Sequence, residues 1–359
     1  MKILLIGRPI DNADLIDSYS TMQSYYLSKS LRKFGIDTIY YDWPRDRLNS
    51  NPNLFSDYKR QLFEFVKLNQ PDHILALGVN FFGHLDRSLG LELSLTFPGI
   101  VAQIHDTSLL DGAPCDLNLT ILDATNNYSD NVNHRLERHL ACNCIIGFAV
   151  DHSLFCPRHR KKDNILRVFV DHQTFFPGNG FGEDYTFTVV ANLMRLKKHL
   201  LQSPMQDTGF DGIDVRTLTA SGIESIDLDK PLFKMYNRES VPVHVLAEEL
   251  GNSDFFIVTH AESIGMCCLE AASSGCSVIA PHSCIKRELV NLLKIYEIGK
   301  QGVIPFDQWK YLLVSNNSDI NRLRTLKYSW DNMAVNIINS FINARKRDNS
   351  HPYPLKLTA

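Results

Sequence analysis

The sequence predicts an α/β chain made of two doubly wound, Rossmann-like domains, and three observations support this fold class. The chain has 359 residues, whereas a single hydrophobic core stops growing at roughly 250–300 residues. Short apolar runs alternate with segments of helical periodicity along most of its length. Residues 153–163 combine Pro157 with a basic run, as linkers do, and the alternation starts again after them.

The first domain is predicted over residues 1–152. An apolar strand at 2–6 ends at Gly7, residues 20–34 have helical spacing, and Gly35 is placed to end that helix. A strand at 36–41 completes a β-α-β unit, so the sheet is predicted to be parallel. The remaining elements expected here are a helix at 55–68 and strands at 73–77, 100–104, 119–122 and 144–148.

The second domain is predicted over residues 164–326 and repeats this pattern. Strands are expected at 165–170, 215–219, 255–258 and 277–280, with helices at 186–201, 243–250, 266–273 and 289–293. A final amphipathic helix is predicted within residues 327–345, and a surface tail at 346–359. Two such domains are expected to face a cleft, because ligands of open α/β sheets bind at the carboxyl ends of the strands.

Composition and charge argue against several classes of partner. The formal net charge is −3 and the pI is about 6.5, so neither a nucleic acid nor an anionic membrane is expected as a partner. No apolar run approaches the roughly 18 residues of a membrane span, and the apolar start is too short for a signal peptide, which predicts a cytoplasmic protein. The eight cysteines lack metal-site spacing, so no metal site is predicted.

The most informative stretch is residues 260–281, which follows a predicted strand and begins a predicted helix. A helix N-terminus offers N–H groups and a partial positive charge, both of which suit a diphosphate. Gly265 leaves room for a ligand to approach the backbone. Carboxylates of Glu262 and Glu270 would repel phosphate, so we expect them to face the neutral hydroxyls of a sugar or a ribose.

This stretch resembles the Glu-x7-Glu signature of retaining GT-B glycosyltransferases of the large family 4 group. Ile264 stands where the family usually has Phe, and Ser277 where it usually has Pro. The rest of the chain agrees with that family in layout alone, including a late helix that in this fold crosses back to the first domain. The residues that match in register are Glu262, Gly265, Leu269, Glu270, Ala271, Gly275, Val278 and Ile279.

The resemblance implies a role for each matching position. Glu262 would hold hydroxyls of the donor sugar and belong to the catalytic set, and Glu270 would bind the ribose of the nucleotide. The segment with Tyr236 and Arg238 would lie against the nucleotide base. The residues assigned to donor binding at this turn are Ser263, Ile264, Gly265 and Met266, of which the last three would present backbone N–H groups to the donor phosphates.

The first domain contributes residues at the carboxyl ends of its strands. His105 follows a predicted strand, where family 4 enzymes commonly place a histidine near the reacting centre, and Asp106 comes next. The alternative, an ordinary loop histidine, stays open. Gly7 and Arg8 end the first strand and should line the same cleft, although Arg8 is equally suited to pairing with a surface acid.

One family feature is missing from its usual place. The family has an Arg and a Lys near the start of the second domain that neutralise the diphosphate, but residues 171–180 contain neither. His172 and Arg238 are the candidates for that charge.

The predicted function is transfer of a sugar from a nucleotide-sugar donor, such as a UDP- or GDP-sugar, with retention and without a metal or other cofactor. Three alternatives stay open: another GT-B enzyme of nucleotide sugars, such as an epimerase or a phosphorylase; a non-catalytic nucleotide- or sugar-binding protein; and a glycosyltransferase acting on DNA bases. The acceptor and the oligomeric state are not encoded in any readable motif.

Overall fold

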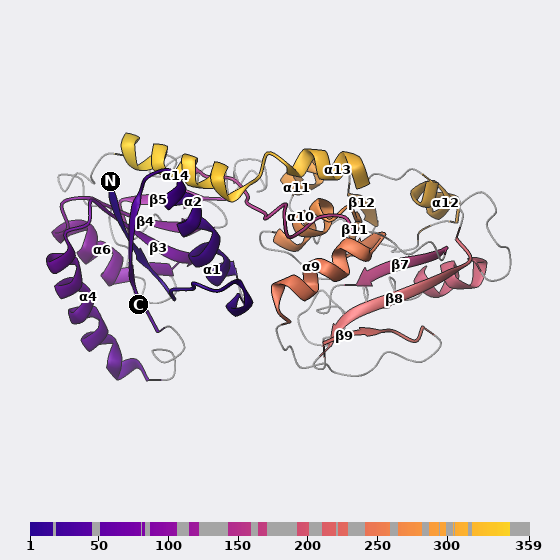
Figure 1. Ribbon diagram of the computed structural model, residues 1–359, viewed down its shortest axis with the longest axis horizontal. Helices are drawn as coiled ribbons and strands as arrows, with labels where there is room; N and C mark the ends of the chain where they lie inside the picture. The colour runs from indigo at the N-terminus through magenta and orange to yellow at the C-terminus, as the bar shows by residue number, and fades with distance from the viewer. Residues whose placement is uncertain are drawn as a thin grey trace, which may run out of the picture. The chain divides into compact units, whose positions relative to one another are not determined.

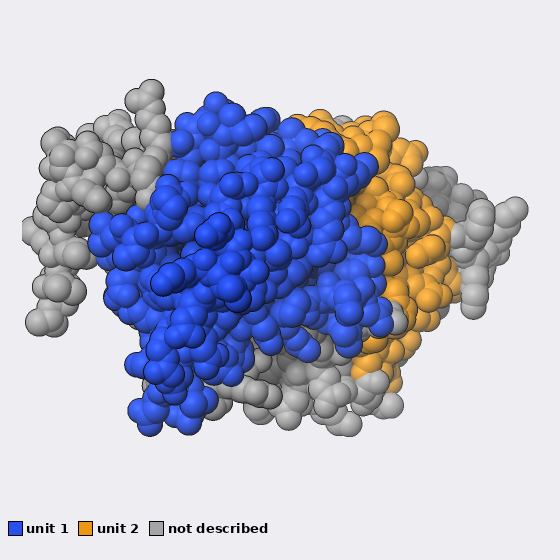
Figure 2. Space-filling model, turned by 60° about the vertical axis from the view of Figure 1, so that its left-hand side comes forward, with its two compact units in different colours: residues 1–147, 330–359 blue, residues 148–329 orange. Residues whose placement is uncertain are grey.

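The computed structural model divides into two compact units (Figure 2). Unit 1 comprises Met1–Gly147 and Trp330–Ala359, and unit 2 comprises Phe148–Ser329. The structure describes residues 1–16, 19–44, 51–79, 81–82, 87–105, 115–121, 143–158, 164–170, 192–200, 210–219, 222–228, 241–258, 265–281, 287–293, 295–298, 304, 306–314 and 318–344.

Unit 1 is built on a six-stranded sheet in the order β2-β1-β3-β4-β5-β6, and every pairing is parallel. Residues of β1 beyond its first are buried on both faces, as expected of a parallel sheet covered by helices. The chain goes from β1 to β2 on one side of it and then to β3 on its other side, so the strand order reverses between β1 and β3. The strands are β1 (Lys2–Ile6), β2 (Asp37–Tyr41), β3 (His73–Val79), β4 (Ile100–His105), β5 (Leu117–Thr120) and β6 (Asn143–Ile145).

Helices cover both faces of this sheet (Figure 1). On one face, α4 (Phe55–Asn69) and α6 (Arg87–Thr96) pack their buried leucines against Leu4, Ile74 and Val101. The other face carries a helix that runs continuously through α1 (Tyr19–Met22), the π-helical turn η2 (Gln23–Leu27) and α2 (Ser28–Lys33). Two short 3-10 turns, η1 (Ala13–Leu15) and η3 (Pro52–Leu54), complete the described helical elements of this unit before its last helix.

The last described helix, α14 (Trp330–Asn343), belongs to unit 1 although it follows unit 2 in the chain. Its Trp330 ring stacks on Tyr26 with centroids 5.6 Å apart, and Phe341 stacks on His73 at 4.7 Å. Lys33 of α2 forms an ion pair with Asp331. The predicted return of the last helix to the first domain is therefore confirmed.

Unit 2 contains a second six-stranded sheet, in the order β12-β11-β10-β7-β8-β9. All pairings are parallel except that of β8 with β9, which is antiparallel. The chain proceeds from β7 outward to β8 and β9 and then returns to β10 on the other side, so the reversal lies between β7 and β10. The strands are β7 (Ile165–Val170), β8 (Gly212–Thr219), β9 (Gly222–Ser225), β10 (Phe255–Ile257), β11 (Ser277–Pro281) and β12 (Tyr296–Ile298).

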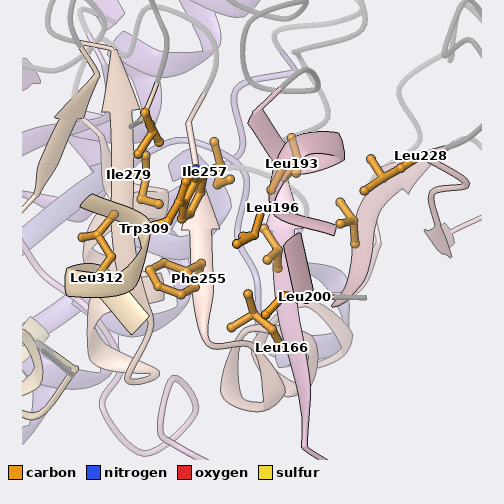
Figure 3. Packing of buried hydrophobic residues seen from close by; sticks show 14 residues of the cluster. Leu166, Leu193, Leu196, Leu200, Leu228, Phe255, Ile257, Ile279, Trp309 and Leu312 are labelled. Atoms are coloured by element: carbon orange, nitrogen blue, oxygen red, sulfur yellow. The ribbon is translucent and has the colours of Figure 1, made fainter. Parts of the chain in front are cut away.

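The core of unit 2 lies between this sheet and the helices on one of its faces (Figure 3). Leucines of the helix at residues 192–200 contact Leu166 and Val168 of β7, and Trp309 meets Phe255 edge-on at 6.3 Å. The described helices, besides the one at 192–200, are α9 (Val243–Asn252), α10 (Met266–Ser273), α11 (Arg287–Leu292), α12 (Phe306–Val314) and α13 (Ser318–Thr325).

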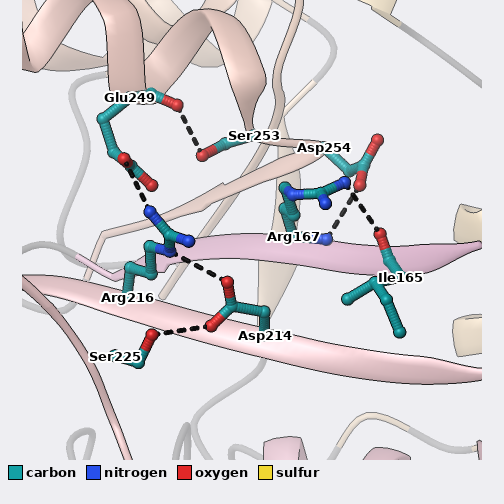
Figure 4. Close-up of polar contacts among 8 residues, drawn as sticks. All are labelled: Ile165, Arg167, Asp214, Arg216, Ser225, Glu249, Ser253 and Asp254. Carbon is teal, nitrogen blue, oxygen red and sulfur yellow. Dashed lines mark hydrogen bonds and ion pairs between the residues drawn. The ribbon is translucent and has the colours of Figure 1, made fainter. Parts of the chain in front are cut away.

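A polar cluster lies on the opposite face, towards the amino ends of the strands (Figure 4). Arg216 contacts Asp214 at 2.9 Å and Glu249 of α9 at 3.2 Å. Burial alone would lower the pKa of Arg216, but the two carboxylates outweigh it and raise that pKa. Burial also raises the pKa of Glu249, the less exposed member of its pair, against the opposing effect of Arg216. This cluster joins α9 to β8 and lies away from the strand ends at which α10 begins.

The structure departs from the sequence predictions in several short or irregular elements and in three helices, α6, α12 and α13, that were not predicted. The strands β9 and β12 were not predicted, because three or four residues are too few to establish a periodicity. The predicted helix at 20–34 contains a π-helical turn, which a 3.6-residue pattern does not reveal. The strand predicted at 119–122 begins at Leu117, and its last residue is Thr120. None of the described helices is long and apolar enough to cross a membrane.

Candidate functional site

The candidate site in unit 2 is the start of α10, the helix that follows β10. Val258 continues β10, and its N–H donates to the carbonyl of Ile279 at 2.9 Å. The helix begins at Met266, immediately after Gly265, on the carboxyl side of a strand that borders the reversal of strand order. Ligands of open α/β sheets bind at such positions. In any α-helix the first-turn N–H groups have no acceptor within the helix, which makes this end suitable for an anion.

Position 265 requires glycine because of its backbone conformation and its contacts within the protein. Its φ is +73°, in the left-handed region that side chains rarely adopt. A Cβ at this position would overlap Cδ1 of Leu289, which is itself fully buried. The carbonyl of Gly265 accepts the N–H of Cys268 at 3.1 Å and so closes the first turn of the helix. Glycine therefore fixes where α10 begins and allows α11 to pack against that end.

Glu270 lies one turn into α10, on the same stripe of the helix as Met266. Residues four apart occupy one side of an α-helix, and Met266 is half-buried whereas Glu270 is only 5% exposed. A carboxylate this buried requires polar partners, because desolvation strongly disfavours its charged form. The structure thus places the second glutamate of the Glu-x7-Glu pattern inside unit 2 rather than on its surface.

The far end of α10 is held by hydrogen bonds that involve His152. The Oγ of Ser273 donates to the carbonyl of Phe155 at 2.7 Å, and the Nδ1 of His152 lies 2.8 Å from that same Oγ. The guanidinium of Arg322 in α13 donates to the carbonyls of Ser273 and Phe155. Both ends of the helix are therefore anchored by contacts within unit 2. The sequence patterns did not point to this anchor.

Several predicted site residues lie outside the described residues. They include the first glutamate of the Glu-x7-Glu pattern and the two residues after it, and the two candidates for the positive charge of the donor site. The tyrosine expected beside the nucleotide base and the aspartate that follows His105 also belong to this group. Their roles stay predictions: Glu262, Ser263, Ile264, His172, Arg238, Tyr236 and Asp106.

The predicted site residues of unit 1 lie at the carboxyl ends of β1 and β4. His105 is the last residue of β4, is 9% exposed, and accepts the N–H of Ile121 on its carbonyl at 2.9 Å. Gly7 follows β1, where it donates to the carbonyl of Tyr41 at 3.1 Å. Arg8 comes next and is exposed. β1 and β4 are separated in the sheet by β3, so these residues share one edge without being direct neighbours.

A row of buried polar side chains leads along β4 and β5 towards that edge. Gln103 pairs in register with Asn118, and His105 with Thr120, so all four project from one face. The Nε2 of Gln103 donates to Oδ1 of Asn118 at 3.3 Å, and its Oε1 accepts the N–H of Phe82 at 3.1 Å. Polar residues on central parallel strands are unusual, so His105 belongs to a polar half-face and not to an isolated loop position.

The described cysteines and acids offer no metal centre. Among residues that the structure describes, no group of three or more His, Cys, Asp or Glu side chains is arranged to hold a metal ion. The six described cysteines are free thiols, and Cys276 directs its Sγ to the carbonyl of Leu250 at 3.1 Å.

Comparisons with known proteins show a shared fold. No known family model matches the chain, and no curated protein matches it in sequence. Sucrose-phosphate synthase from Thermosynechococcus elongatus is similar in structure, with a TM-score of 0.58 and 11% identity over 95% of this chain and 98% of that one. The lipopolysaccharide outer core galactosyltransferase WaaB has a TM-score of 0.52 and 13% identity over 95% and 99%.

A third similar structure is UDP-GlcNAc 2-epimerase from Neisseria meningitidis bound to UDP-GlcNAc, with a TM-score of 0.52 and 11% identity over 95% of this chain and 100% of that one. At such low identity these likenesses concern the fold. They agree with the division into two α/β units, each built on a mostly parallel sheet. The chain accordingly has the GT-B fold of two Rossmann-like domains.

Proposed function

We propose that this chain is a glycosyltransferase that moves a sugar from a nucleotide-sugar donor to an acceptor. The observation that carries the proposal is the start of α10 within a GT-B fold. A left-handed Gly265 sets the first turn of this helix at the carboxyl end of β10, and Glu270 lies one turn further along. The fold supports the general class, and the residues at this turn support the donor.

The donor diphosphate would occupy the end of α10. As the bond between sugar and phosphate breaks, negative charge grows on the leaving diphosphate, and fixed N–H dipoles stabilise that charge. Glu270 would accept hydrogen bonds from ribose hydroxyls, and Glu262 would do the same for the donor sugar. His172 or Arg238 would supply the positive charge that the usual Arg and Lys provide. Tyr236 would lie beside the base.

The edge of unit 1 would supply the remaining contacts. His105, Asp106, Gly7 and Arg8 are proposed to meet the sugar, the acceptor or the donor phosphate. Retention of the anomeric configuration and independence from metal ions are also proposed, and they are supported by the resemblance of residues 260–281 to retaining family 4 enzymes. A metal-free, cytoplasmic enzyme agrees with the composition of the chain.

A binding screen tests the donor class. Thermal unfolding is followed with UDP-, GDP-, ADP-, CMP- and dTDP-sugars, because a ligand that binds only the folded state raises its unfolding temperature. We expect one nucleotide class to raise it and the corresponding free diphosphate to do so as well. If no nucleotide sugar at millimolar concentration shifts the transition, the proposal is wrong.

Epimerisation of a nucleotide sugar is the second candidate, because the UDP-GlcNAc 2-epimerase structure is similar in fold. The products separate the two reactions. Transfer yields free nucleoside diphosphate and a new glycosidic bond, whereas epimerisation returns a nucleotide sugar with one inverted carbon. Tight binding with neither product would instead indicate a non-catalytic binding protein, and salt-dependent binding of DNA would indicate the base-modifying alternative.

A further inference from the structure

Two irregularities of the backbone meet at Gln23 in unit 1. The register of β3 against β4 shifts between Ala76 and Val79, so that β3 carries extra residues where β4 has none. Gly78 lies within this bulge and has a φ of +93°. Opposite it, Gln23 begins the π-helical turn η2 of the first long helix. β-bulges and single π turns are both over-represented beside functional sites.

A single hydrogen bond joins the two irregularities. The N–H of Gly78 donates to Oε1 of Gln23 at 2.7 Å. A bulge removes a backbone donor from the ladder of the sheet, and the glutamine oxygen satisfies this donor. The oxygen of the Gln23 amide therefore has a structural role.

The nitrogen of the same amide has no such role within the described residues. Gln23 is fully buried, and its Nε2 has no hydrogen-bond partner there. A buried donor without an acceptor costs about 1–3 kcal/mol, and the great majority of such groups are satisfied. An acceptor from outside the chain, a water molecule or an oxygen of a ligand, would remove this cost.

The position of Gln23 favours a ligand. Gly78 is near the carboxyl end of β3, and β3 with β1 borders the reversal of strand order in unit 1. A Cβ built at Gly78 would come within 3.4 Å of Cβ of Ser20, which is half-buried, so this part of the edge reaches solvent. Gly7, at the end of β1, approaches Leu77 so closely that its own Cβ would lie 3.1 Å from Cβ of Leu77.

We propose that Gln23 is a binding residue for a neutral, hydroxylated acceptor such as a glycoside, and that its Nε2 donates to a hydroxyl oxygen of that acceptor. An amide is an uncharged donor, and burying a phosphate against it would leave the charge uncompensated. A hydroxyl oxygen matches it without that cost. The identity of the ligand as an acceptor rests on the proposed glycosyltransferase function, but the binding of a glycoside at Gln23 is testable without it.

Gln103 provides a matched control in the same unit. It is also a fully buried glutamine, and its Oε1 also accepts a backbone N–H, that of Phe82. Its Nε2, however, already donates to Asn118. The two glutamines thus differ in whether the side-chain Nε2 has a hydrogen-bond partner, which is the property on which the proposal depends.

The experiment follows the side-chain amide signals of both glutamines by NMR in the full-length ¹⁵N-labelled chain. Gln23→Leu and Gln103→Leu assign the signals by their loss. The probes are the methyl glycosides of glucose, galactose, mannose and N-acetylglucosamine, with inorganic phosphate as a separate arm. We expect at least one glycoside to move the Gln23 signal saturably while the Gln103 signal stays in place. Gln23→Leu should weaken that glycoside about fivefold to tenfold, as loss of one hydrogen bond does.

Three results would overturn the proposal. No glycoside moves the Gln23 signal; phosphate moves it and no glycoside does; or Gln103→Leu weakens glycoside binding as much as Gln23→Leu. Gln23→Glu, which keeps an oxygen for Gly78, replaces Gln23→Leu where the latter does not fold. A UDP titration of the unmodified chain tests the donor site separately, so failure at Gln23 is distinguishable from failure of the proposed function.

Discussion

The imidazole of His152 joins the end of α10 to the segment through which the chain leaves unit 2. Its Nδ1 lies 2.8 Å from Oγ of Ser273, and its Nε2 lies 3.1 Å from the carbonyl oxygen of Tyr328. That carbonyl also accepts the N–H of Val150, so the chain segments entering and leaving unit 2 are bonded to each other. A titratable side chain therefore holds the helix of the candidate donor site against both of these segments.

Stability should fall as the solution is acidified through the range in which histidines titrate. Burial lowers the pKa of His152, with Arg322 acting in the same direction, and burial also lowers the pKa of His73. The unfolded chain then binds protons that the folded chain does not, so stability is full above the unfolded pKa of about 6.5 and decreases as pH falls towards the folded values. Urea unfolding at pH 7.5, 6.5 and 5.5 measures the decrease.

Substitution identifies the histidines responsible. His152→Gln and His73→Gln should each flatten this part of the stability profile, and the double variant should flatten it most. A NMR titration that gives His152 a pKa above that of an unfolded peptide would contradict the account.

Gly265→Ala should lower the free energy of unfolding of unit 2 by more than the strain of a left-handed φ alone would. Strain at φ +73° costs about 1 kcal/mol, and the overlap with Leu289 adds about 1–3 kcal/mol of overpacking. Gly35→Ala is the control, because Gly35 has φ +77° and no atom within 4 Å of its added Cβ. Equal losses from the two variants in chemical denaturation would show that contact with Leu289 is unimportant.

Unit 1 should depend on α14 for its stability. Ile337 is fully buried in this helix, so Ile337→Ala should cost about 2–5 kcal/mol. Ile342, on the same helix, is 68% exposed, and Ile342→Ala should change stability by no more than about 0.5 kcal/mol. Equilibrium unfolding in urea, followed by circular dichroism, compares them. A small loss at Ile337 would mean that α14 contributes little to unit 1.

Much of the fold was predictable from the sequence, because central parallel strands are apolar on both faces. The mainly apolar runs at residues 2–6 and 165–170 predict β1 and β7 for this reason. The edge strand β9 is half-exposed and short, so neighbouring β8 determines it more than its own residues do. The bulge at Gly78 arises between two strands and likewise has no local signature.

The candidate site was predictable where it depends on local backbone. Gly265 marks the start of α10, as expected, but its identity follows from a left-handed φ and from Leu289, a residue distant in sequence. Gln23 could not be singled out, because its unpaired amide nitrogen is evident only after the first helix and β3 are placed together. The roles of Glu262 and Glu270 remain predictions.

The start of α10 is proposed to bind the donor and to support transfer. The most direct measurement is the rate of nucleotide release from the donor sugar selected by the thermal screen, in the unmodified chain and in Glu262→Ala and Glu270→Ala, with the fold of each variant checked by its unfolding transition. We expect measurable release by the unmodified chain and a loss of at least about 100-fold in each folded variant, equivalent to about 2.7 kcal/mol of transition-state stabilisation. Unchanged release in both folded variants would contradict this proposal.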